Sequence, residues 1–160
     1  MLDVTTGSSL SLRRCELFEP LSDAQIEELA SCGRRRALVA GETLLSENAE
    51  ADELFVVEHG LLQVKLAVSG GRVVSSAEAG PGQLVGWSAL AAPHAYFAEV
   101  VALTDGVVLA LSAADVEEVL LREPAAGYAM MKRIAGLISM RLRDLKEEFV
   151  ELLSTQAQPR

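Results

Sequence analysis

The chain has 160 residues, half of them hydrophobic, and a formal net charge of -9 at pH 7. This length can bury one sizeable core but is short for two ordinary domains, so we expect one domain with a helical appendage. The acidic balance argues against direct nucleic-acid binding, because phosphates require a basic surface. The apolar runs stop well short of the roughly 20 residues of a membrane-spanning helix, and no signal peptide is recognisable. The sequence therefore predicts a soluble, cytoplasmic protein without membrane contact.

The sequence offers no metal or cofactor site. Cys15 and Cys32 have no metal-ligand spacing, and neither lies near a histidine in sequence, so we expect no disulfide framework and no bound metal. The basic run Arg34-Arg35-Arg36 leaves two alternatives open. It forms either an anion or partner patch, or a solvated turn that leads into a strand, and the second is more usual for a charge run.

A short helix is predicted near the N-terminus. Ser22 is followed three residues later by Gln25, which is the spacing of a capping box, and Ile26, Leu29 and Ala30 then recur at helical spacing. We expect this helix to span residues 22–31. Residues 1–14 are treated as an N-terminal segment.

From Arg36 onward the pattern changes to short runs of Val, Leu and Phe separated by glycines, which is typical of a strand-rich barrel. Turns are expected at the glycines of 41–42, 59–60, 69–71 and 104–106, because glycine adopts the positive φ of tight turns. Strands are predicted near residues 37–40, 54–58, 61–68, 72–77, 98–103 and 107–111. These strands and the helix before them form the predicted domain of residues 15–124.

Two helices are predicted after the strands. Ser112 is a good N-cap for the first, which ends at Glu123 because Pro124 disfavours helix at the preceding residue. The second spans residues 125–153, followed by a frayed tail at 154–160. Its apolar positions alternate spacings of four and three, as in a coiled coil, and predict a parallel homodimer. These positions are Met131, Ala135, Ile138, Leu142, Leu145, Phe149 and Leu152. The alternative is that this seam packs on its own domain.

The order of these motifs resembles the cyclic nucleotide-binding domain family, the sensor module of catabolite-activator/Fnr-like regulators and of cyclic-nucleotide-gated channels and kinases. The resemblance is carried by Leu17-Phe18, by residues 40–44 and 51–60, and by a cassette at residues 82–102. It implies a mostly β fold. This is a jelly-roll-like β-roll (double-stranded β-helix) of about eight strands, with N-terminal helices and a long C-terminal lid helix.

The cassette departs from the family pattern at the ligand contacts. The family has Gly-Glu, which binds the ribose hydroxyl, where this chain has Gly86-Trp87. It has Arg, then Ser or Thr, then Ala at the cyclic phosphate, where this chain has Tyr96-Phe97-Ala98. Strand alternation would place Tyr96 and Ala98 on one face and Phe97 on the other. On a rough alignment, the lid-helix polar groups correspond to Leu145 and Lys146.

These losses predict weak or no binding of cyclic AMP or cyclic GMP, and a pocket suited to a more apolar ligand. The candidate pocket residues are Gly86, Trp87, Ser88, Ala89, Leu90, Tyr96, Phe97 and Ala98. We expect a stand-alone regulatory sensor that is not an enzyme, works through a homodimer and a protein partner, and lacks the DNA-binding domain of many bacterial relatives.

Three alternatives stay open. Trp87, Tyr96 and Phe97 could fill the old cavity and leave a protein-interaction scaffold without a ligand. The chain could instead bind cyclic nucleotide through a rearranged contact, with Arg72 or Lys146 supplying the charge. A haem ligand at His94 is the third and weakest.

Overall fold

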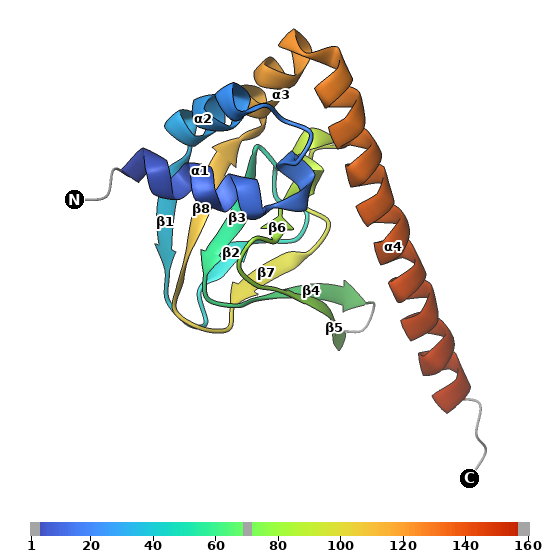
Figure 1. Ribbon diagram of the computed structural model, residues 1–160. Helices are drawn as coiled ribbons and strands as arrows, with labels where there is room; N and C mark the ends of the chain where they lie inside the picture. Colours follow the sequence, from blue (N-terminus) through green and yellow to red (C-terminus); the bar gives the residue numbers. More distant parts are fainter. Residues whose placement is uncertain (1–3, 69–71, 157–160) are drawn as a thin grey trace.

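The computed structural model describes residues 4–68 and 72–156. In this part of the chain, helices lie on one side of a β-roll and a long C-terminal helix extends past it (Figure 1). The helices are α1 (Val4–Arg14), α2 (Asp23–Cys32), α3 (Ala113–Arg122) and α4 (Pro124–Gln156), with short 3-10 helices η1 (Glu16–Phe18) and η2 (Trp87–Leu90). The strands are β1 (Arg34–Leu38), β2 (Thr43–Leu45), β3 (Glu53–His59), β4 (Leu62–Val68), β5 (Arg72–Ala79), β6 (Leu84–Val85), β7 (Glu99–Ala102) and β8 (Gly106–Ser112).

The strands form two antiparallel sheets of four, in the orders β1-β8-β3-β6 and β2-β7-β4-β5. This confirms the predicted β-roll and its mostly β class. Two strands were not predicted, β2 and β6, which have only 3 and 2 residues. Such lengths are too short to show an alternating pattern. The predicted turn at residues 69–71 lies outside the described residues.

Strands β3 and β8 lie at the centre of the first sheet and carry much of the core. Residues 54–58 of β3 are all buried, with no polar face. One face of this sheet lies towards the roll interior, and α1, α2 and α3 contact its strands β3 and β8. A strand covered on both faces reads as a continuous apolar run, which is why β3 was readily predicted.

The basic run Arg34-Arg35-Arg36 lies in β1, not in the predicted solvated turn, because β1 pairs with β8 from its first residue onward. Its three side chains reach three different carboxylates, those of Glu53, Glu58 and Glu42 in that order, at 2.5, 2.8 and 2.9 Å. The arginines therefore serve intramolecular ion pairs, and the strand prediction of 37–40 was placed too late.

One of these ion pairs ties α1 to the roll. The Glu58 side chain is 3% exposed, and its carboxylate accepts from Arg35 Nε at 2.8 Å and from Ser11 Oγ at 2.8 Å. Gly7 of α1 lies so close to the Arg35 guanidinium that a Cβ at this position would collide with it. Helix α1 therefore packs on the sheet through a buried polar contact. This helix was not predicted from the sequence, which left residues 1–14 as an N-terminal segment.

The capping box of α2 is confirmed. Ser22 Oγ accepts from the Gln25 backbone N–H at 3.3 Å, and Gln25 Oε1 accepts from the Ser22 N–H at 2.8 Å. This reciprocal pair satisfies two helix N–H groups that otherwise lack partners. The helix runs to Cys32, one residue beyond the predicted end.

Helix α4 is anchored to the domain by its first turns. Gly127 approaches the end of α3 so closely that a Cβ would lie 3.2 Å from Leu120 O. Met130 and Ile134 are buried, and Arg133 donates to Glu16 O at 2.9 Å. Beyond these residues α4 continues as a long projecting helix (Figure 1). None of the helices in the described part of the chain combines the length and apolar character needed to cross a bilayer.

Candidate functional site

The central turn of the cassette lies where β6 ends. Gly86 follows β6 with φ of 81° and leads into η2. A Cβ here would lie 3.1 Å from Glu53 O, so a side chain would meet both an unfavourable backbone conformation and a close backbone neighbour. Glycine at this position is therefore required by the turn, and it places Trp87 and Ser88 beside the roll interior.

Tyr96 is the residue predicted to stand in place of the family's phosphate-binding arginine. Its side chain is buried, and its hydroxyl donates to Glu53 O at 2.8 Å. Burial raises the pKa of Tyr96 above its ordinary value. The backbone is held as well, since Tyr96 N–H donates to Ala49 O at 2.9 Å and Asn48 N–H donates to Tyr96 O at 2.9 Å. The one donor of this side chain is thus already used within the protein.

Phe97 behaves differently from the strand alternation predicted for it. Strand β7 begins only at Glu99, so residues 96–98 are not in the ladder, and Phe97 lines the same cavity as Tyr96 and Ala98. The centre of its ring lies 6.3 Å from that of Trp87, tilted by 34°, and the residue is 48% exposed. Phe97 therefore forms part of the cavity mouth.

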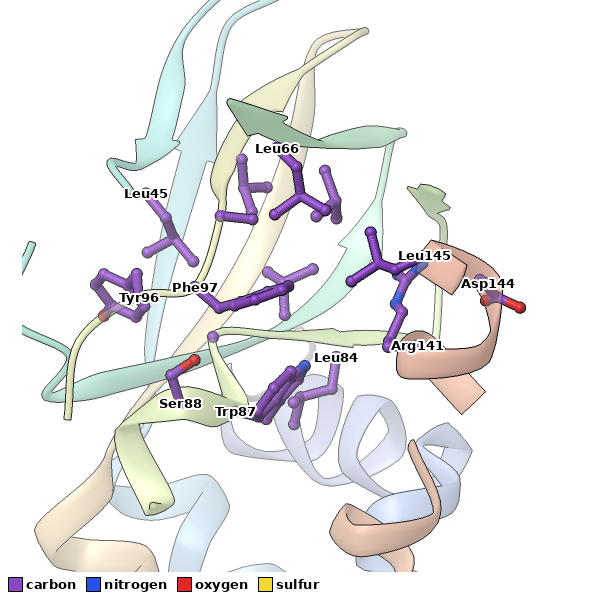
Figure 2. Close-up of a pocket in the computed structure, with 15 residues that line it drawn as sticks. Leu45, Leu66, Leu84, Trp87, Ser88, Tyr96, Phe97, Arg141, Asp144 and Leu145 are labelled. Atoms are coloured by element: carbon purple, nitrogen blue, oxygen red, sulfur yellow. The ribbon is translucent and has the colours of Figure 1, made fainter. Parts of the chain in front are cut away.

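The cassette, the strands and α4 enclose a cavity of about 50 Å³ (Figure 2). Its wall from the β-roll is apolar except for the hydroxyls of Ser88 and Tyr96 and the indole N–H of Trp87. The lining residues are Leu45, Val64, Leu66, Leu84, Val85, Gly86, Trp87, Ser88, Tyr96, Phe97, Ala98, Val100, Arg141, Asp144 and Leu145. This volume is far below the roughly 300–1,000 Å³ of ordinary ligand pockets.

The lid helix contributes the two charged residues of this wall, Arg141 and Asp144, together with Leu145. Figure 2 shows the Arg141 side chain extending along α4 beside Leu145, whereas the Asp144 carboxylate points away from the cavity. Lys146, the residue aligned to a family base contact, is exposed and lies off this wall. Sequence reasoning missed Arg141, although it lies one helical turn before Leu145 and hence on the same face.

A second, larger hollow adjoins this cavity. It has a volume of about 540 Å³ and is bounded by the end of α1, η1, the turn between β5 and β6, and α4. Leu84, Val85, Trp87, Arg141 and Asp144 line both spaces. The two spaces therefore adjoin at these five residues.

Two residues predicted for the pocket lie elsewhere. Ala89 and Leu90 pack into the hydrophobic core and do not line the cavity. His94 is exposed, with Nδ1 3.1 Å from Ala89 O, and is also off the cavity wall. In residues 4–68 and 72–156 no group of three or more His, Cys, Asp or Glu side chains could hold a metal ion. The side chain of Arg72 is outside the described part of the chain.

The predicted dimer seam divides into two parts. Leu145 lines the cavity, and on the same side of α4 lie the buried Met130 and Ile134. The other seam positions are exposed, and form an apolar stripe that we call the α4 stripe. Its members are Met131, Ala135, Ile138, Leu142, Phe149 and Leu152. The seam therefore does not pack entirely on its own domain.

Among curated proteins, the chain is similar to an uncharacterized NTE family protein of Mycobacterium tuberculosis, and to its counterpart in Mycobacterium bovis. Each is 29% identical over 133 residues, which are 83% of this chain and 22% of the relative. The chain thus spans about a fifth of the length of the curated relatives it matches.

Solved structures share the fold. The N-terminal domain of a transcriptional regulator from Streptomyces coelicolor is 32% identical, with a TM-score of 0.67, covering 87% of this chain and 94% of that one. The sensor domain of the transcriptional regulator DNR from Pseudomonas aeruginosa is 16% identical, with a TM-score of 0.75, covering 87% and 93%. The regulatory subunit of a cAMP-independent protein kinase A from Trypanosoma brucei is 21% identical, with a TM-score of 0.73, covering 83% and 47%.

The family model described as cyclic nucleotide-binding domain matches residues 35–123, more than half of the chain. This match agrees with the two four-stranded sheets and with the Streptomyces structure. The chain belongs to the cyclic nucleotide-binding domain family, whose members are generally regulatory or sensor modules.

Proposed function

We propose that this domain is a sensor in which the family pocket has changed its ligand, so that it binds cyclic AMP and cyclic GMP weakly or not at all and takes a smaller, more apolar molecule. The observation that carries the proposal is Tyr96. It stands where the family has its phosphate-binding arginine, and its hydroxyl is used by Glu53 O.

The energetic consequence follows from the charge. An arginine that meets a phosphate forms charge-assisted hydrogen bonds of about 1.5–3 kcal/mol each, so its absence costs about 10–150-fold in affinity. Trp87 in place of the ribose-binding glutamate removes another polar contact. The fold itself does not imply dependence on cyclic AMP, since a regulatory subunit of this fold belongs to a cAMP-independent protein kinase A of Trypanosoma brucei.

The test is a calorimetric titration of the native chain with cyclic AMP and cyclic GMP. We expect no saturation below about 1 mM, since two lost contacts of about 2 kcal/mol each lower the affinity about 1,000-fold and move a micromolar site into the millimolar range. The variant Tyr96→Arg should bind cyclic AMP at least about tenfold more tightly, and Tyr96→Phe should not. A low-micromolar dissociation constant for the native chain would remove the proposal.

The domain acts as a homodimer through the α4 stripe. Leu142 and Phe149 are 68% and 62% exposed, and a row of large apolar side chains at heptad spacing is stable in water when a second helix covers it. Because Arg141 and Leu145 lie on the adjacent face of α4, occupancy of the cavity and the dimer contact involve the same helix.

Sedimentation equilibrium of Leu142→Glu tests the dimer. We expect the native chain to sediment as a dimer and Leu142→Glu as a monomer, because a charge buried in the stripe is costly. Met140→Glu is the matched control, since Met140 is 60% exposed but points to another side of α4. A monomeric native chain at about 50 μM would contradict the proposal, as specific dimers of this kind associate in the micromolar range or below.

The small cavity favours one other function, a protein-interaction scaffold that has kept the fold and lost its ligand. A space of about 50 Å³ holds one or two waters rather than a metabolite unless a side chain moves. The two functions differ in the response of the domain to small apolar molecules: a sensor is stabilised by one of them, and a scaffold by none.

A further inference from the structure

We infer that the cavity is a binding site for a small aromatic monocarboxylate, with its carboxylate on Arg141 of α4 and its ring in the space that the Phe97 ring now occupies. This inference rests on the proposed change of ligand and names its chemical class. It is argued from the cavity wall, from the source of its charge and from the side chain at its mouth.

The apolar wall of the cavity favours a ligand that is apolar apart from its charged group. On the β-roll side, the lining side chains are aliphatic or aromatic, and the Tyr96 hydroxyl already donates to the backbone at 2.8 Å. Ser88 and the Trp87 indole are the remaining polar groups there, and neither carries a charge. A polyanion or a sugar ring would leave its polar groups without partners on these walls, which is costly for each group.

The charge comes from the lid helix. Arg141 is partly buried where α4 passes the cavity, and Figure 2 shows it on the cavity side while Asp144 points away. A planar guanidinium next to apolar surface is well matched to a planar carboxylate, which it binds through two parallel hydrogen bonds. Arg141 is the one cation among the described lining side chains and Asp144, the one anion, points away from the cavity, which fits a ligand with one negative charge.

The size of the cavity identifies the group that must move. A cavity of about 150 Å³ holds benzene, whereas this one measures about 50 Å³, so a ring enters only when a lining side chain leaves. Tyr96 is held by its hydrogen bond and by burial. Phe97 is 48% exposed, lies outside the β7 ladder and can turn into solvent. A ligand ring that replaces the Phe97 ring keeps the stacking contact with Trp87, now 6.3 Å away.

The site has a built-in reporter, because Trp87 is the single tryptophan of the chain and lines the cavity. The experiment is a titration of the full chain with phenylacetate, followed by Trp87 fluorescence and confirmed by calorimetry. Phenylacetamide, which has the same shape without the charge, is the matched ligand control.

We expect phenylacetate to bind at least about tenfold more tightly than phenylacetamide, since the charge-assisted pair contributes most of the difference. Arg141→Gln should abolish this preference, whereas Arg143→Gln, an exposed charge on the opposite side of α4, should keep it. Phe97→Ala should bind phenylacetate several-fold more tightly, because no ring has to be displaced.

Each contrary result has a distinct meaning. Equal binding of phenylacetate and phenylacetamide, or an unchanged preference in Arg141→Gln, overturns the carboxylate assignment and leaves the altered apolar sensor intact. No response of either the native chain or Phe97→Ala to about 10 mM phenylacetate, a concentration at which even a millimolar site is filled, overturns the inference altogether. Tight cyclic AMP binding removes the proposed function instead.

Discussion

The strongest quantitative expectation concerns the buried ion pair between Arg35 and Glu58. The Glu58 side chain is 3% exposed and that of Arg35 is 38% exposed, so the two partners have unequal access to water. In Arg35→Met, Glu58 keeps its charge in the interior with Ser11 as a donor, at a cost of about 3 kcal/mol. In Glu58→Gln, Arg35 can turn to solvent and the new amide can still accept from Ser11, so the cost falls to about 1–2 kcal/mol.

The double variant Arg35→Met/Glu58→Gln tests whether the destabilisations of the two single variants add. With no charge left buried, it should be less destabilised than Arg35→Met alone, at about 1–2 kcal/mol. For a chain of this length 1 kcal/mol corresponds to about 2–4 °C, so Arg35→Met should melt about 6–12 °C below the native protein. Urea unfolding, followed by Trp87 fluorescence at one fixed protein concentration, gives the free energies directly.

The neighbouring residue provides the control. Arg34 lies in the same strand and pairs with Glu53, but its side chain is 75% exposed, so Arg34→Met should cost no more than about 1 kcal/mol. If Arg35→Met destabilised the protein no more than Arg34→Met, or if the double variant were as unstable as the sum of its parts, the unequal-burial argument would be refuted.

Three further outcomes are expected. Gly136→Ala should stabilise the protein by about 0.5–1 kcal/mol in urea unfolding, because a Cβ there meets no atom within 4 Å and the helix loses a flexible residue. Burial raises the pKa of Tyr96 above 10, so stability present below pH 10 should decline as the pH rises further, and Tyr96→Phe should remove that decline in urea unfolding at pH 9–11. Iodoacetamide should label exposed Cys32 well before buried Cys15, whose pKa burial raises, as followed by mass spectrometry.

The parts of the fold that follow from local pattern were predictable from sequence. The capping box at Ser22, the apolar run of β3 and the proline that follows α3 each act on neighbouring residues, and all three are confirmed. The run Arg34-Arg35-Arg36 was misread because its partners lie 6 to 23 residues away in sequence. No local pattern shows that such carboxylates come to lie beside β1.

The site was predicted in outline but not in detail, because its details depend on contacts between residues that are distant in sequence. The cassette glycine and the residues beside it are set by the turn at Gly86. The contribution of Arg141 depends on the path of α4 across the roll, which the anchoring of Met130 and Ile134 determines. The place of Phe97 at the cavity mouth depends on where β7 begins, and a strand end cannot be located from alternation alone.

Because α4 is anchored by its first turns, a tilt of the helix has its pivot near Ile134, and displacements grow with distance from that residue. Arg141 lies 7 residues from that point, or about 10 Å, and Gln156 lies 22 residues away, or about 33 Å, at 1.5 Å per residue. A tilt that carries Arg141 1 Å towards the roll therefore moves the far end by about 3 Å. Because packed side chains interdigitate at the scale of a methyl group, a displacement of that size is enough to break one helix contact and form another.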